Sequence, residues 1–257
     1  MKHTHKYTVI TGASSGIGYE AAKAFAARGH SLILIARRTE RLEKLRTEIH
    51  AAHPSIDIIL KSVDLSIAEN VLRVYEEVKA LPLGTWVNNA GFGILKAFHN
   101  ISNEENTNLI NTNITALTLL SQEFIKTQKR GYILNVASIA AFLPGPLLST
   151  YYASKAYVLS LSAAVNEELK RSGKPISVTT LCPGPMKTEF FATAGASKEF
   201  ATATPRACAK RALSAMFKRK PIVFSDNLIA LAAFGTKFLP INLLTKISYR
   251  IQRSKFM

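Results

Sequence analysis

Cysteine is scarce in this sequence, which contains only Cys182 and Cys208 and no CxxC pair. Two cysteines are too few for a disulfide framework, and unpaired ones give no sign of a zinc site, so we expect no bound metal and a reducing compartment. A reactive thiol needs an electropositive, partly exposed surrounding, which the sequence does not indicate. We therefore expect both thiols to be inert.

Long hydrophobic runs are also missing. No uninterrupted apolar stretch reaches the ~18 residues that span a bilayer, because the best candidate, after Asn227, is broken by Lys237 and Pro240. Residues 1–6 lead directly into an apolar run from Tyr7, without the h-region of a signal peptide. The sequence thus predicts a cytoplasmic protein without a transmembrane helix.

Acidic residues are few, since 17 Asp and Glu stand against 33 Lys and Arg and give a formal charge of +16. From Ala201 onward Asp226 is the only acid. Such a charge bears on anionic partners and not on the fold. A nucleic-acid binder would account for it, but the basic residues are not interleaved with a stacking platform or placed on a recognition motif, so we expect no nucleic-acid partner.

Short apolar runs alternate with longer helical stretches along the chain. Strands are predicted over 6–11, 32–35, 56–63, 86–87, 132–134, 176–181 and 222–224, and helices over 17–28, 39–51 and 68–80. No repeat or linker divides the sequence. The pattern predicts an α/β fold with one domain over 1–257, a single doubly wound Rossmann-type parallel sheet flanked by helices on both faces.

A glycine-rich turn, TGASSGIG at 11–18, joins the first predicted strand to the first helix. Glycine is needed there because a Cβ would block either the tight turn or the approach of a pyrophosphate to the backbone. An isolated turn of this kind is often only structural, but its place between a strand and a helix N-terminus favours a dinucleotide site. The expected cofactor contacts are Gly12, Ser14, Ser15, Gly16, Ile17 and Gly18.

The second predicted strand is followed by Arg37 and Arg38, with no acid at its end. An acid at this place would accept a hydrogen bond from a ribose hydroxyl, whereas an arginine pairs with a 2′-phosphate. The sequence therefore favours NADP(H) over NAD(H). The alternative, in which both arginines are solvated charges at a helix start, stays open.

Tyr151 and Lys155 stand four residues apart, which places them on one face of a helix. A phenol with a pKa of ~10 exchanges protons poorly at neutral pH, but a nearby ammonium favours the phenolate. We therefore expect Lys155 to lower the pKa of Tyr151 and the pair to do acid/base work. Tyr152 lies three residues from Lys155 and is the less suitable candidate.

Several segments, in the same order, resemble the short-chain dehydrogenase/reductase family and its NADP-preferring branch. The glycine spacing is GxxxGxG, residues 88–91 read NNAG, Ser138 precedes Tyr151 at the family's interval, the YxxxK motif follows, and residues 183–184 read PG. The resemblance covers residues 11 to 188 and weakens after about 190.

The resemblance implies roles for further residues. Ser138 would bind the substrate oxygen, Lys155 would also bind the ribose, and Asn113, in preference to the nearby Asn111, would hold a water beside Lys155. The implied catalytic residues are Asn113, Ser138, Tyr151 and Lys155. The implied cofactor contacts also include Asp64, Asn89, Ala90, Gly91, Tyr151, Lys155, Pro183, Gly184 and Thr188. An aspartate at position 64 could equally be only a helix N-cap.

The activity that the resemblance implies is an NADPH-dependent oxidoreductase acting on an apolar ketone or hydroxy compound. An apolar pocket is suggested by Phe92, Phe142, Phe190 and Phe191, and a substrate lid is expected over about 188–215. One alternative is a 3-oxoacyl-carrier-protein reductase, whose acidic carrier would suit the basic surface. The other is a non-enzymatic NADPH-sensing protein, which would lack a catalytic residue.

A basic C-terminal extension over about 226–257 carries an apolar stripe close to one helical face, formed by Leu228, Leu231, Phe234, Phe238 and Leu239. The basic segment 246–255 follows it. One interpretation is an interfacial segment in peripheral contact with an anionic membrane. The other is that the stripe packs on the core or on a second subunit, and we expect a homo-oligomer.

Overall fold

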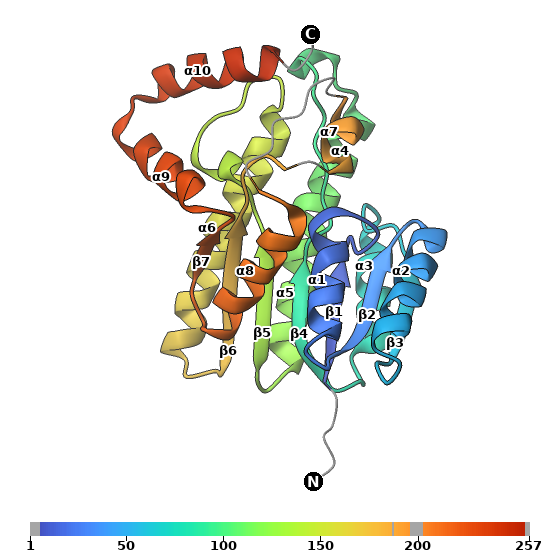
Figure 1. The fold of residues 1–257 in the computed structure, drawn as a ribbon. Helices are drawn as coiled ribbons and strands as arrows, with labels where there is room; N and C mark the ends of the chain where they lie inside the picture. The colour runs from blue at the N-terminus through green and yellow to red at the C-terminus, as the bar shows by residue number, and fades with distance from the viewer. Residues whose placement is uncertain (1–5, 187, 196–202, 255–257) are drawn as a thin grey trace.

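The computed structural model describes residues 6–186, 188–195 and 203–254, without the side chains of 191 and 192. In this part of the chain seven strands form one parallel sheet in the order β3-β2-β1-β4-β5-β6-β7 (Figure 1). The strands are β1 (Tyr7–Thr11), β2 (Ser31–Ala36), β3 (Ile58–Ser62), β4 (Leu83–Asn88), β5 (Gly131–Val136), β6 (Ile176–Cys182) and β7 (Ile222–Phe224). The predicted Rossmann-type sheet is confirmed.

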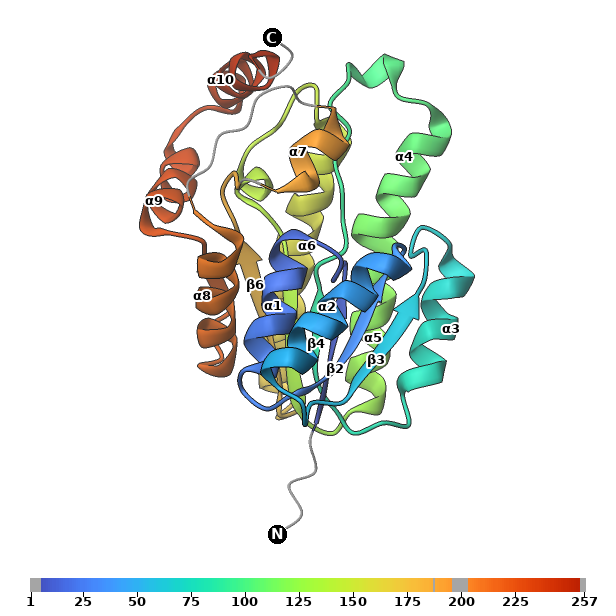
Figure 2. The ribbon, with the colours of Figure 1, turned by 45° about the vertical axis from the view of Figure 1, so that its right-hand side comes forward.

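Helices cover both faces of the sheet (Figure 2). On one face lie α1 (Gly16–Ala26), α2 (Thr39–Ala52) and α8 (Pro205–Phe217), and on the other lie α3 (Ala68–Val78), α5 (Ala116–Thr127) and α6 (Ser149–Arg171). The two hydrophobic cores are centred on Phe25 and Leu34 on the first face and on Trp86 and Phe124 on the second. Strands buried on both sides explain the continuous apolar runs of the sequence.

The predicted lid of about 188–215 extends too far. Its first described part is α7 (Glu189–Ala194), but α8 packs against α1 and buries Cys208, Ala212 and Met216. These residues recur every four positions and form a core-facing stripe, so α8 belongs to the core. Residues 196–202 of the predicted lid lie outside the described residues.

The remaining helices stand mainly at the carboxyl edge of the sheet. The helix α4 (Asn103–Ile110) continues through η2 (Asn111–Thr115), a π-helical turn, into α5. Short helices η1 (Phe98–Asn100) and η3 (Ile139–Phe142) lie in loops. After β7 come α9 (Asn227–Gly235), η4 (Thr236–Phe238) and α10 (Ile241–Arg253), above the sheet in Figure 1. No helix among the described residues combines the length and apolar character needed to cross a membrane.

A buried polar network joins the central strands. The Asn88 side chain accepts from Trp86 Nε1 and donates to Asn135 Oδ1, each at 2.9 Å. Asn135 Nδ2 in turn donates to Ser162 Oγ of α6 at 2.9 Å. Because every described member has a partner, the network fixes β4, β5 and α6 relative to one another without an unpaired buried group.

We expect Asn135→Ala to lower the free energy of unfolding by about 2–3 kcal/mol, because it removes one bond to Asn88 and one to Ser162 and leaves buried groups unpaired. Urea unfolding followed by circular dichroism measures this change. Asn103→Ala, at an exposed position of α4, is the control and should change the free energy by less than about 0.5 kcal/mol. Equal stability of the two variants would contradict the assigned role of the network.

Candidate active site

A cavity of about 400 Å³ opens at the carboxyl edge of the sheet, where the strand order reverses between β1 and β4. Open parallel sheets bind ligands at such a switch point. Among its lining residues are most of the expected contacts: Gly12, Ser14, Ser15, Gly16, Ile17, Arg37, Arg38, Asp64, Asn89, Ala90, Gly91, Ser138, Tyr151, Lys155, Pro183, Gly184 and Thr188. Gly18 and Asn113 do not line the cavity, but they lie next to the lining residues Gly12 and Gly91.

The glycine turn approaches the end of β4 too closely for side chains. Gly12 has a φ of +65°, and a Cβ on it would lie 2.8 Å from the Ala90 Cα, while one on Gly18 would lie 2.4 Å from the Gly12 oxygen. Asn89 Nδ2 donates to the carbonyl oxygens of Thr11 and Gly12, each at 3.0 Å. The turn is thereby held as a cradle at the N-terminus of α1, where backbone N–H groups favour a phosphate, so these residues fit a dinucleotide.

The two arginines after β2 have different partners. Arg38 Nη2 donates to Ser14 Oγ at 3.1 Å and to Glu189 Oε2 of α7 at 2.7 Å. Arg37 is more exposed, and its Nη1 lies 3.9 Å from Asp64 Oδ2. Asp64 also accepts from the backbone of Ser66, which holds the start of the following loop. Arg38 thus faces the glycine turn, whereas Arg37 is largely exposed to solvent.

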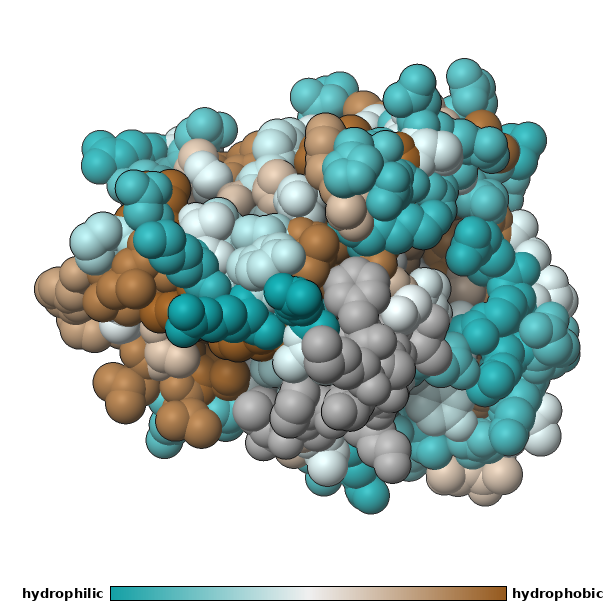
Figure 3. Space-filling view, turned by 90° about the horizontal axis from the view of Figure 1, so that it is seen from above, coloured by the Kyte–Doolittle hydropathy of each residue, from teal (hydrophilic) through white to brown (hydrophobic). Residues whose placement is uncertain are grey.

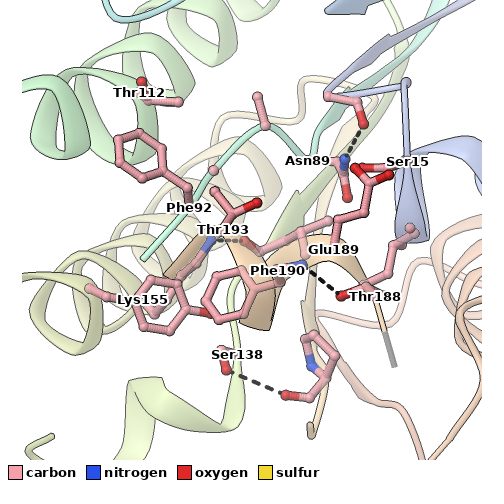
Figure 4. Close-up of a pocket in the computed structure, with 18 of the residues that line it drawn as sticks. Ser15, Asn89, Phe92, Thr112, Ser138, Lys155, Thr188, Glu189, Phe190 and Thr193 are labelled. Atoms are coloured by element: carbon pink, nitrogen blue, oxygen red, sulfur yellow. Dashed lines mark hydrogen bonds between the residues drawn. The ribbon is translucent and has the colours of Figure 1, made fainter. Parts of the chain in front are cut away.

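Glu189 is a pocket residue that the sequence pattern did not indicate. It accepts from both Arg38 and Arg41, and these bonds lower the pKa of its carboxyl group, so it is ionised at neutral pH. Figure 4 shows Glu189, Phe190 and Thr193 of α7 between Ser15 on one side and Ser138 and Lys155 on the other. Its contact with Arg38 joins residues 151 positions apart, a separation at which no local pattern gives a signal.

Ser138, Tyr151 and Lys155 all line the cavity, with Ser138 and Lys155 on the side away from Ser15 (Figure 4). The hydroxyl of Ser138 donates to the Pro183 carbonyl at 3.5 Å and lies close enough to the Tyr151 phenol to lower its pKa, and Lys155 Nζ lies 5.7 Å from the centre of the tyrosine ring. Lys155 Nζ also donates to the Val136 carbonyl at 2.8 Å, which anchors it at the end of β5. The three side chains form one cluster of a proton donor, a hydroxyl and an amine.

Asn113 supports this cluster from the π-helical turn η2. Its Nδ2 donates to the Phe92 carbonyl and to Ser154 Oγ of α6, each at 3.0 Å. A Cβ on Gly91 would lie 3.0 Å from Asn113 Oδ1 and 3.4 Å from Lys155 Nζ, so all three groups are close. The nearby Asn111 points elsewhere, since it donates to the Ser66 carbonyl. The structure therefore places Asn113, and not Asn111, beside the lysine.

The pKa of Tyr151 is raised overall, whereas the sequence analysis expects Lys155 to lower it. Burial raises the pKa of the Tyr151 phenol, and the hydrogen bond with Ser138 opposes this only in part. Burial also lowers the pKa of Lys155 to about 8. Desolvation is the largest cause of both shifts, because the charged form of each group loses hydration in this buried place. The phenol is therefore a protonated donor.

Aromatic and apolar side chains surround the tyrosine. The Phe190 ring lies 5.0 Å from that of Tyr151, and Phe92 and Leu148 also line the cavity. Phe142, expected in the pocket, instead packs on Phe224 at 5.7 Å, because η3 turns its side chain towards β7. The side chain of Phe191 lies outside the described residues.

Tyr152 also lines the cavity, but its hydroxyl is engaged elsewhere. It accepts a hydrogen bond from Gln252 Nε2 of α10, one hundred residues later in the chain. Sequence spacing alone makes Tyr152 the less suitable base, and this bond gives it a different task. It connects the cavity wall to the C-terminal helices.

Both thiols are buried, and burial raises the pKa of Cys182 and of Cys208 to about 12. A thiol with such a pKa is almost entirely protonated at neutral pH and is a weak nucleophile. This agrees with the expectation that both are inert.

A family model described as short chain dehydrogenase matches residues 6–199. The chain belongs to this family. The match covers the glycine turn, the NNAG segment, Ser138 and the YxxxK motif, which is the part of the chain that builds the cavity. Members of the short-chain dehydrogenase family are oxidoreductases that use a nicotinamide cofactor.

Curated relatives share the same region. A very-long-chain 3-oxoacyl-CoA reductase of Mycosarcoma maydis is 34% identical over 181 residues, covering 67% of this chain and 51% of the relative. The 17-beta-hydroxysteroid dehydrogenase type 3 of Homo sapiens is 34% identical over 186 residues, covering 70% of this chain and 59% of the relative. The chain thus spans little more than half the length of these short-chain dehydrogenases.

Solved short-chain dehydrogenases match over nearly the whole chain. One from Sphingobium yanoikuyae in complex with NADPH is 29% identical with a TM-score of 0.77, covering 91% of this chain and 96% of that one. The bulky-bulky ketone specific alcohol dehydrogenase from Comamonas testosteroni is 27% identical with a TM-score of 0.76, covering 92% and 96%. One from Burkholderia phymatum in complex with NAD, 21% identical with a TM-score of 0.80, supports the fold alone.

We expect Lys155→Met to stabilise the protein at neutral pH. The pKa of Lys155 is about 8 in the folded protein against an ordinary value of 10.5, so the unfolded chain binds more protons between these values. Stability therefore rises with pH over this window, and the full penalty of about 3 kcal/mol applies below it. Loss of the bond to the Val136 carbonyl offsets about 1 kcal/mol.

The difference is measured by urea unfolding of both proteins at pH 7 and near pH 10. The variant should be more stable by about 2 kcal/mol at pH 7, and the gap should shrink at the higher pH because Lys155 is then neutral in the fold. A variant less stable than the parent at pH 7 would show that burial of the charged lysine does not destabilise the fold.

Proposed function

We propose that the chain is an NADPH-dependent carbonyl reductase, or alcohol dehydrogenase in the reverse direction, acting on an apolar ketone or hydroxy compound. The observation that carries the proposal is that Ser138, Tyr151 and Lys155 line the same cavity as the glycine turn and Arg38. In Figure 4, Ser138 and Lys155 lie on the side away from Ser15 of the turn. The cavity thus combines a candidate proton donor with a candidate phosphate site, as a reductase requires. A protein that only senses NADPH would not need this cluster.

Preference for NADPH rests on Arg38 and Ser14. Their side chains bond to each other beside the glycine turn, so a 2′-phosphate there would meet a guanidinium and a hydroxyl together. In this structure the same guanidinium donates a hydrogen bond to the carboxylate of Glu189. A phosphate would take over a position already suited to an anion, which favours NADPH over NADH.

The chain's own residues would handle the substrate oxygen and its proton. The Ser138 hydroxyl would hold the oxygen, and the Tyr151 phenol, kept protonated by burial, would donate its proton to it. Lys155, which is anchored on the Val136 carbonyl, would stabilise the phenolate that remains after proton transfer. Asn113 would hold the backbone beside Lys155 in position. The bound nicotinamide would supply the hydride.

An apolar, bulky carbonyl compound suits the pocket best. Phe92, Leu148 and Phe190 line the cavity around Tyr151. The relatives named very-long-chain 3-oxoacyl-CoA reductase and bulky-bulky ketone specific alcohol dehydrogenase are named for carbonyl compounds of this type. A 3-oxoacyl-carrier-protein reductase is the second candidate on account of the basic surface. Cytoplasmic location and a homo-oligomer stay predictions.

We expect Tyr151→Phe to reduce turnover by about 10²–10⁴-fold while leaving NADPH affinity nearly unchanged, because it removes the proton donor and little of the cofactor site. Ketones of graded chain length, assayed by NADPH absorbance, provide the rate, and fluorescence titration provides the affinity. Tyr157→Phe, on the exposed side of the same helix, is the control. Retention of more than about a tenth of the activity by Tyr151→Phe would sink the assignment.

We expect Arg38→Ala to weaken NADPH by about tenfold or more and NADH much less, because a charge-assisted bond to the 2′-phosphate is lost. Arg37→Ala should act in the same direction but less, since Arg37 is the more exposed. Glu189→Gln should strengthen NADPH about twofold by freeing Arg38, a modest effect for a half-exposed pair. Arg46→Ala on α2 is the control, and equal losses for both cofactors would refute the preference.

A further inference from the structure

The apolar stripe of the C-terminal extension is exposed. Leu228 is 66% exposed, Leu231 67% and Phe238 71%, so the interpretation in which the stripe packs on the core is wrong. In α9 only Ile229 and Ala233 are buried, while Phe234 points outward and its ring packs on that of Phe238 at 5.1 Å. Large apolar side chains therefore lie in water side by side, which monomeric proteins avoid.

The helix α10 extends this apolar surface with an inverted pattern. Two of its buried residues, Ser248 and Gln252, are polar, whereas Leu243, Ile247 and Ile251 at helical spacing are exposed. A helix between a protein core and water normally shows the reverse arrangement. The outer side of α10 is therefore built for surroundings that are not aqueous.

We call the exposed surface of α9, η4 and α10 the C-terminal face. Figure 3 looks down on this end of the molecule and shows hydrophobic residues gathered at its left, with hydrophilic ones beside them. The hydrophilic residues of these helices include Lys237, Lys246, Arg250 and Arg253, and residues 227–257 contain no acid. On α10 the basic positions adjoin the apolar ones around the helix, as in segments that lie in a membrane interface.

We propose that the C-terminal face docks on an anionic lipid bilayer. The charged residues of this apolar face are all basic. Its apolar side chains would be buried in the acyl region of the bilayer, and its basic side chains would be attracted to the negative headgroups. A second copy docked through the same face would oppose cations to cations with no acid on the face to pair with them. An acidic protein would satisfy the charges but not require the exposed leucines and phenylalanines.

The inner side of α10 reaches the cavity, which gives docking a consequence for access. Gln252 is buried and donates to the hydroxyl of Tyr152, a cavity-lining residue adjacent to Tyr151. One helix thus presents its outer side to the proposed bilayer and its inner side to the pocket wall. An apolar substrate dissolved in the membrane would enter close to Tyr151. This last step rests on the proposed function, whereas docking itself does not.

Co-sedimentation of the full chain with vesicles tests docking without any assay of activity. We use phosphatidylcholine vesicles with and without phosphatidylglycerol, and expect binding only when the anionic lipid is present. Added salt should release the protein, because the Debye length falls from about 10 Å at 0.1 M to about 3 Å at 1 M. NADPH binding to the released protein confirms that it is still folded.

Two double variants separate the apolar and the charged contributions. Lys246→Gln with Arg250→Gln should weaken binding about 30-fold, from roughly fivefold per charge. Leu231→Gln with Phe238→Gln should weaken it at least about tenfold. Lys218→Gln with Lys220→Gln is the control of equal charge. These residues precede β7 and lie at the amino ends of the strands, away from the C-terminal face, so this change should leave binding within about threefold.

Other outcomes overturn the proposal. Recovery in the supernatant with both kinds of vesicle would do so, as would equal binding to neutral and anionic vesicles. A dimer in sedimentation velocity that Leu231→Gln with Phe238→Gln abolishes, without vesicle binding by the parent protein, would assign the face to a second copy. Docking that persists in a protein with no reductase activity would leave this proposal standing and remove only the proposed function.

Discussion

The close approach of the turn after β1 to the end of β4 is the constraint on which the rest of the site depends. Gly12 and Gly18 leave no room for a Cβ, and Asn89 bonds to the turn carbonyls, so the two strand ends are fixed at contact distance. This contact lies where the strand order reverses, and it therefore sets the floor of the cavity. Ser14 follows the end of β1 and Gly91 the end of β4, while Arg38, after β2, reaches Ser14 through its side chain, so the three strand ends line a single cavity.

Burial governs the protonation of the groups around Tyr151. Lys155 is only 5% exposed, and the same dry surroundings that lower its pKa raise that of Tyr151. At neutral pH the phenol is thus protonated while the lysine still carries most of its charge, which suits donation of a proton from the phenol. A nearby positive charge would shift this balance towards phenolate, because an ionised phenol in a low dielectric needs a partner charge.

Local patterns are enough to predict the sheet and most of the cavity lining, because strand ends and glycine turns depend on a few neighbouring residues, such as 11–18. Contacts between distant segments are not predictable in this way. Glu189 on Arg38 and Gln252 on Tyr152 depend on how α7 and α10 fold back over the sheet. The predicted lid extends too far because the alanine-rich sequence of α8 does not reveal its core stripe. The raised pKa of Tyr151 could not be predicted because spacing carries no information on burial.

Two contacts tie the C-terminal helices to the cavity. The backbone N–H of Gly184, in the loop after β6, donates to Ser225 Oγ at 3.1 Å, and Asp226 next to it caps α9. Gln252 at the other end bonds to Tyr152 of α6. The helices are therefore anchored at both ends to cavity walls, one in the PG loop and one beside Tyr151. Because the C-terminal helices are attached at two separate places, they cannot rotate about either attachment alone. A partner bound to their outer side therefore has a defined orientation relative to the cavity.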